Sequence, residues 1–279
     1  MRKTALAASG FALLLALTAC GSESTPTTNN TAAPQADNKP ASSLFNDAQE
    51  LVRAASSKAD QAKSAKFTIE MDMMGQKISG SGQGSFEGAN SKMTMSMQMM
   101  GMSIEMRMVD GVVYMKLPEG QAPSGKPWVK LDGADSAELG QAMNQAEQSD
   151  PRKILEMVQK AGKITKSEPA TLDGQEVSHY FVDLDLKKAG GIGGASEADL
   201  KKLPDGVVVP MELWLNAEQL PVQVTMDLGE MMKKAAEQAG QSLPGGTEVG
   251  GKMTMKYSDW GAPVEVEAPP ADQVGTMPK

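Results

Sequence analysis

Residues 93–108 read MTMSMQMMGMSIEMRM, and this stretch decides the fold. Methionine or isoleucine occupies every second position on both sides of Gly101, and Thr, Ser, Gln, Glu or Arg occupies most positions between them. Such alternation is typical of β-strands with one buried face, and antiparallel pairs commonly have one apolar and one solvated face. The stretch therefore predicts an antiparallel hairpin with a flexible, methionine-rich apolar face.

The same two-residue period continues on both sides of this hairpin. Residues 67–73 and 78–86 predict two strands, and the second has glycine at 80, 82 and 84, which indicates a bent or closely approached sheet. Asp110-Gly111 predicts the next hairpin turn. Further strands are expected around Val113 and Met115 and at 128–131, 163–166, 177–186, 207–215, 221–228 and 252–260.

Helical spacing interrupts the strands in a few places. Residues 44–63 carry an apolar stripe at intervals of three and four residues. Asp150-Pro151 and Gly162 match the start and end of a helix over 151–161. Helices are also expected at 136–148 and around 230–239, and the proline-rich tail from Gly261 is expected to run along the surface. About ten strands and three or four helices, mostly joined by short turns, predict an α+β fold with a predominantly antiparallel sheet.

The amino terminus predicts where the protein resides. Arg2 and Lys3 precede thirteen uncharged residues, 5–17, which describe a secretory signal peptide and are too few to span a membrane. The following Leu-Thr-Ala-Cys resembles a bacterial lipobox, which implies that Cys20 carries the lipid anchor and that cleavage occurs before it. We therefore expect a signal peptide over 1–19, a lipidated Cys20 with a disordered tether over 20–43, and one domain over 44–279, on the extracytoplasmic face of the cell membrane.

Composition argues against several function classes. Cleavage would leave 25 basic against 35 acidic residues, a net charge near −10, which disfavours nucleic acid as a partner. His179 is the only histidine, Gly-x-Ser-x-Gly is absent, and the glycine-rich run at 190–194 lacks phosphate-loop and dinucleotide-binding spacing. We accordingly expect no enzyme, catalytic residue, metal or cofactor, and expect His179 and its neighbours Asp183 and Asp185 to have structural or solvent-facing roles.

Three interpretations compete for the methionine faces. They could form an ordinary core, bind Cu(I) through thioethers, or line a cavity for a large apolar ligand of variable shape. Copper is disfavoured because same-face neighbours on a strand lie about 7 Å apart and because His and Cys co-ligands are missing. Packed cores usually favour Leu, Val, Ile and Phe over Met. The abundance of methionine on these faces therefore favours the cavity. The candidate lining residues are Met71, Met73, Ile78, Met93, Met95, Met97, Met102, Ile104, Met106, Met108, Leu213, Val224, Met226, Met253 and Met255.

The carboxy-terminal half contains short motifs that suggest a family. They are LWLN at 213–216, LPV at 220–222, YSDWG at 257–261 and PV at 263–264. Together with the lipobox, the tether and the strand meander, these motifs resemble the LppX/LprG-type lipoproteins of actinobacterial envelopes. The resemblance covers residues 44–270. Members of this family are similar to the lipoprotein carriers LolA and LolB. The resemblance implies a strongly curved antiparallel β half-barrel wrapped around helices, with an apolar cavity between them.

Function is expected to follow the same resemblance. Members of the family bind acylated lipids or glycolipids and are implicated in moving them through the envelope. The expected partners are therefore an acylated lipid or glycolipid, the cell membrane through the anchor, and a membrane transporter as a further candidate. The alternative is a non-catalytic envelope sensor or protein-interaction module without lipid cargo.

Overall fold

The computed structural model describes residues 44–73, 76–87, 91–99, 101–118, 125–131, 149–189, 206–238 and 251–276. Twelve strands among these residues form one sheet in the order β12-β6-β5-β4-β3-β2-β1-β11-β10-β9-β8-β7. The strands are β1 (Ser64–Met73), β2 (Gln76–Ser85), β3 (Lys92–Met99), β4 (Met102–Val109), β5 (Val112–Lys116), β6 (Trp128–Leu131), β7 (Gly162–Leu172), β8 (Gln175–Asp185), β9 (Val208–Leu215), β10 (Pro221–Asp227), β11 (Gly251–Ser258) and β12 (Val274–Thr276).

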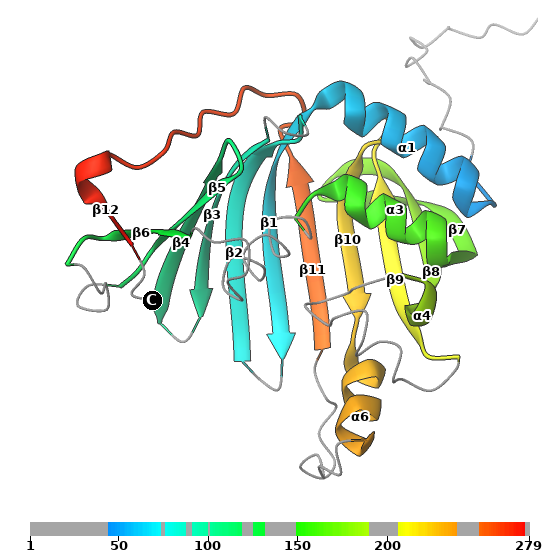
Figure 1. Cartoon of the computed structure of the whole chain (residues 1–279). Coiled ribbons are helices and arrows are strands. Elements are labelled where there is room, and N and C mark those ends of the chain that lie inside the picture. Colours follow the sequence, from blue (N-terminus) through cyan, green and yellow to red (C-terminus); the bar gives the residue numbers. More distant parts are fainter. Residues whose placement is uncertain are drawn as a thin grey trace, which may run out of the picture. The chain divides into compact units, whose positions relative to one another are not determined.

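The sheet consists of two meanders that meet at its centre. Strands β1 to β6 form the first meander and β7 to β11 the second, and β1 pairs with β11 to join them (Figure 1). Every neighbouring pair is antiparallel except β12 with β6. Strands β12 and β7 are the two edges, so the sheet is not closed into a barrel. The α+β fold with a predominantly antiparallel sheet is confirmed.

The helices of the described residues are α1 (Ala48–Ala62), α3 (Pro151–Ala161), α4 (Leu186–Ala189) and α6 (Gly229–Gln238), with the 3-10 turn η2 (Ala271–Gln273). The predicted limits of α3 are confirmed: the Asp150 side chain accepts a hydrogen bond from the Arg152 amide, and Pro151 starts the helix. Helix α1 begins after Asp47, whose carboxylate accepts bonds from two backbone amides. The predicted helix over 136–148 and the glycine run at 190–194 lie outside the described residues.

The apolar stripes of the helices cover one face of the second meander. Helix α1 packs on α3, and α3 packs on β8 and β7 (Figure 1). Leu51 of α1 and Leu155 of α3 are fully buried in the same cluster as Tyr180 of β8. The buried core therefore lies between these helices and the apolar face of the sheet.

Two strand predictions need correction. Strand β7 is longer than the expected 163–166: it pairs with β8 as far as Leu172, with a register shift between Ile164 and Lys166. No strand is expected in the tail beyond Gly261, only a path along the surface, and the structure adds β12, which pairs in parallel with β6. Between β11 and β12, residues 262–270 cross the first meander (Figure 1). The backbone carbonyls of Glu265 and Glu267 accept side-chain hydrogen bonds there. The surface path of this part of the tail is confirmed.

Candidate functional site

The pairing register places the predicted lining residues on one face of the sheet. Met95 of β3 lies opposite Met106 of β4, and Met253 of β11 lies opposite both Met71 of β1 and Met226 of β10. Directly opposed residues of antiparallel strands point to the same side. All fifteen predicted residues share this side, which we call the methionine face.

Burial varies along the methionine face. Met93, Met95, Met106, Leu213, Val224, Met226, Met253 and Met255 are buried, whereas Met71, Ile78, Met97, Ile104 and Met108 are half-buried. Met102 is 41% exposed, and the structure does not describe the side chain of Met73. In the β3–β4 hairpin, exposure thus rises from 2% at Met95 to 41% at Met102, next to the turn. The chain positions these side chains together, and the prediction that they bind a ligand remains a prediction.

The absence of a side chain at Gly82 of β2 makes room for Phe67 of the neighbouring strand β1 on the methionine face. A Cβ atom added to Gly82 would lie 2.5 Å from Cζ of Phe67 and closer still to the Thr94 carbonyl oxygen. Phe67 is buried and lies directly opposite Gly82 in the register. The phenyl ring therefore lies in the space that a side chain at position 82 would occupy. The interpretation of the β2 glycines as a place of close approach is confirmed at this residue.

The start of α3 lies against the methionine face. The hydroxyl of Ser149 donates to Sδ of Met95 at 4.0 Å, and the hydroxyl of Tyr257 donates to Sδ of Met255 at 3.9 Å. Burial, followed by the negative charge of Asp150, raises the pKa of Tyr257. These phenol and hydroxyl groups bring polar atoms to the buried end of an otherwise apolar surface.

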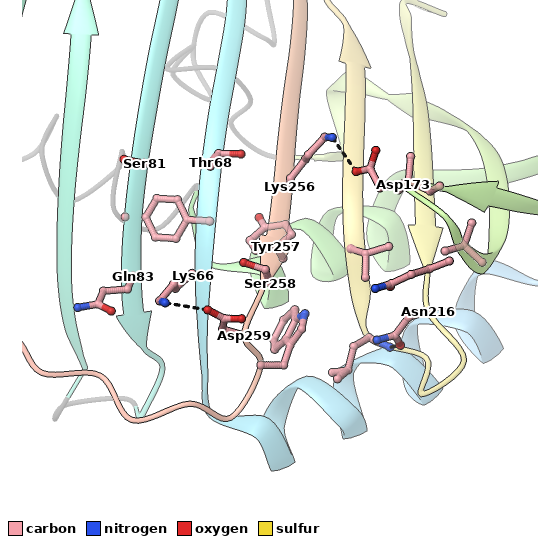
Figure 2. A pocket seen from close by; sticks show the side chains of 18 of the residues that line it. Lys66, Thr68, Ser81, Gln83, Asp173, Asn216, Lys256, Tyr257, Ser258 and Asp259 are labelled. Carbon is pink, nitrogen blue, oxygen red and sulfur yellow. Dashed lines mark hydrogen bonds and ion pairs between the residues drawn. The ribbon is translucent and has the colours of Figure 1, made fainter.

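The opposite face of the sheet, which we call the polar face, contains a trough of about 950 Å³. Neighbouring strands contribute hydroxyl, amide and charged side chains to it, including the ten that Figure 2 labels. Nζ of Lys66 lies 2.7 Å from Oδ2 of Asp259, and Nζ of Lys256 lies 2.9 Å from Oδ2 of Asp173 (Figure 2). None of the fifteen predicted lining residues borders this trough. The lining residues are Lys66, Phe67, Thr68, Ser81, Gly82, Gln83, Thr94, Ser96, Glu105, Leu172, Asp173, Gln175, Val177, Asn216, Glu218, Leu220, Val222, Lys256, Tyr257, Ser258, Asp259 and Trp260.

Sequence reasoning missed this trough. Alternation indicates which polar residues share a face, but it contains no signal that the face is hollow. The hollow depends on the hairpin after β7 and the loop after β9, which supply Asp173 and Asn216 to its wall. Those two loops are 43 residues apart in the sequence. Four residues of the YSDWG motif at 257–261, one of the motifs on which the family resemblance rests, line the trough.

His179 lies on the polar face among residues from three strands. Its Nε2 lies 2.8 Å from Oε2 of Glu212 and its Nδ1 lies 3.8 Å from Oε1 of Glu168. The imidazole stacks on Trp214 at 4.2 Å between ring centres and lies 4.1 Å from the Phe181 ring. The carboxylates that contact it belong to neighbouring strands, not to Asp183 or Asp185 of its own strand.

The predicted lipid-anchor residue Cys20 and the signal peptide lie outside the described residues. Among the helices that the structure does describe, none is long and apolar enough to cross a membrane.

Comparison with known proteins gives little guidance. No protein-family model matches the chain, and no curated protein matches it. Among solved structures, the chain is similar to one titled "Crystal structure of MucB in complex with MucA(peri)", with 11% identity and a TM-score of 0.32. The alignment covers 81% of this chain and 58% of the MucB chain, so it spans less than two thirds of that protein.

Proposed function

We propose that this protein is a lipid-anchored, non-enzymatic envelope protein that binds an acylated lipid or glycolipid against its methionine face and carries or presents it there. The supporting observation is the graded exposure of that face. A set of apolar side chains continuous with the core passes from fully buried Met95, through half-buried Met97 and Ile104, to exposed Met102. An acyl chain laid along the exposed end would complete the burial of these side chains.

The energetics of this proposal are favourable. Burial of one methylene group contributes about 0.8 kcal/mol, so a dozen would contribute on the order of 10 kcal/mol before the costs of ordering. Methionine suits a ligand of variable chain length because it has three rotatable torsions and a polarisable sulfur. A curved half-barrel with an apolar cavity between sheet and helices, as the family resemblance implies, is part of this proposal.

Native mass spectrometry of the full chain, purified from bacterial membranes, tests lipid binding. Met97→Glu adds a charge to the half-buried part of the methionine face, and we expect it to lose most of the bound lipid. Gln98→Glu is the matched control, because residue 98 is exposed on the opposite face of the same strand. Absence of lipid from the original protein, or equal lipid in the two variants, would contradict the proposal.

The anchor is tested separately. Cys20→Ser removes the thiol that the lipobox would modify, and we expect the variant to move from the membrane fraction to the soluble envelope fraction. Retention of Cys20→Ser in the membrane fraction would show that Cys20 is not the attachment point.

The polar face supports the alternative function, an envelope sensor or interaction module. Partly exposed Phe181 lies on β8, next to the edge strand β7, and partly exposed Trp214 lies on β9, one strand further in. Aromatic residues are enriched at protein interfaces. This alternative expects no lipid in the purified chain. It also expects Trp214→Ala, which leaves the methionine face unchanged, to abolish crosslinking to an envelope protein in cells.

A further inference from the structure

We propose that the trough on the polar face binds a linear, neutral saccharide chain. The trough lies on the side of the sheet away from the methionine face, so it is a second site and does not depend on lipid binding. Leu172 of β7 and Val177 of β8 also border it, and its floor extends from Glu105 on β4 to Val222 on β10, across six neighbouring strands. At the usual spacing between strands this is roughly 24 Å, enough for several sugar rings in a row.

The hydrogen-bonding groups of the trough are available to a ligand. The hydroxyls of Thr68, Ser81, Ser96 and Ser258 form no hydrogen bond with any other residue that the structure describes. Asn216 uses its side-chain oxygen to accept two backbone amides, which leaves its NH₂ group directed to no described partner. Hydroxyls both donate and accept, which matches the hydroxyl groups of a sugar.

The charges of the trough disfavour an anionic ligand. Lys66 and Lys256 each form an ion pair with a carboxylate across the trough (Figure 2). A phosphate or carboxylate ligand would compete with Asp259 and Asp173 for these ammonium groups. A neutral ligand can instead accept from the lysines and donate to the carboxylates without breaking either pair.

The strands of the trough also disfavour an extended peptide. Peptides recognised on sheets usually add a strand at a free edge. Each of β1, β2, β3, β10 and β11 pairs on both sides, so its backbone groups are already used. Side chains therefore supply the hydrogen-bonding groups that a ligand can reach over this floor. The observations therefore favour a ligand whose own hydrogen-bonding groups project sideways from a chain of rings.

Trp260 supplies a fixed apolar surface at one end of the trough. Its indole N–H donates to the Pro221 carbonyl at 2.9 Å, and its ring lies 5.9 Å from the Tyr257 ring. Both contacts hold the indole in place before a ligand arrives. The apolar C–H face of a sugar ring can pack against such an indole without ordering a mobile side chain.

An array of neutral linear oligosaccharides, acidic oligosaccharides and unmodified peptides tests this proposal with the full chain in detergent. We expect binding to a neutral hexose oligomer and, by titration calorimetry with that oligomer, roughly tenfold weaker binding for Trp260→Ala. Ser81→Arg should block the middle of the trough. Ser79→Arg is its matched control, because residue 79 is exposed on the same face of β2 but does not line the trough.

Three results of this experiment would contradict the saccharide site. No captured saccharide, preferential capture of acidic sugars or peptides, or equal binding by the Ser81→Arg and Ser79→Arg variants would overturn the proposal. Thr68→Arg, at another exposed position of the trough floor, provides a second blocking variant if Ser81→Arg unfolds. Native mass spectra of the same samples report bound lipid, so failure of the saccharide site is distinguishable from failure of the lipid site.

Discussion

The methionine face and the polar face are two sides of the same strands, yet they are built from different chemistry. Buried positions on the methionine face hold mostly Met or aliphatic side chains, together with the rings of Phe67, Tyr180 and Tyr257. The three tryptophans all avoid it: Trp128 lies under Arg107 on the polar face, Trp214 stacks on His179, and Trp260 borders the trough. The methionine face therefore combines adaptable thioether side chains with a few buried rings, whereas the polar face carries the tryptophans beside hydrogen-bonding groups.

The largest difference between the faces should appear on truncation of aliphatic residues. Leu213 is fully buried between Tyr180 and Val224 in the register, and Leu213→Ala should reduce the free energy of unfolding by about 3–4 kcal/mol through lost burial and a cavity. Val208 begins the same strand and is 41% exposed. Val208→Ala should change stability by less than about 0.5 kcal/mol. Urea unfolding measures both, and similar values would contradict the assignment of the faces.

A smaller effect should follow from an added methyl group. Gly82→Ala places Cβ against the Phe67 ring and the Thr94 carbonyl, and we expect a loss of about 2 kcal/mol from overpacking. Ser81→Ala changes the adjacent, exposed residue of the polar face and should remain within about 0.5 kcal/mol of the original. If alanine at 82 is tolerated as well as alanine at 81, the phenyl ring does not lie as close to β2 as described.

Local pattern predicted much of this architecture. Alternation over 93–108 predicted the antiparallel hairpin with its turn at Gly101, in which Met95 lies opposite Met106, and the Asp150-Pro151 signal located α3. Both depend on contacts between residues close in sequence. The pairing of β1 with β11 joins Met71 to Met253, and no local signal identifies a partner so distant along the chain.

The candidate sites were predictable to different degrees. The two-residue period identifies the apolar face of each strand, and the pairing register then places all fifteen residues on one side of the sheet. The trough and the His179 cluster depend on which strands become neighbours. Glu168 and Glu212 reach His179 only because β7 and β9 flank β8, and the sequence around His179 presents Asp183 and Asp185 instead.

The aromatic cluster of the polar face should contribute less to stability than the core. Trp214→Ala removes the ring that stacks on His179, and we expect a loss of about 1.5 kcal/mol in urea unfolding. Trp214→Phe keeps an aromatic ring and should retain more than half of that stability. Equal losses from the two variants would show that stacking on His179 does not account for the contribution of Trp214.

The smallest effect we expect is a change in acid sensitivity at the same cluster. The hydrogen bond from Lys166, with its positive charge and that of a protonated His179, lowers the pKa of Glu168 from its ordinary value of 4.5. A carboxyl group with a lowered folded-state pKa stabilises the fold above pH 4.5, and this contribution is lost as the pH falls through the folded-state value. Glu168→Gln should therefore flatten the dependence of unfolding free energy on pH below pH 4.5. Lys166→Met should move the Glu168 pKa, measured by NMR titration, back up, and an unchanged pKa would assign the shift to another group.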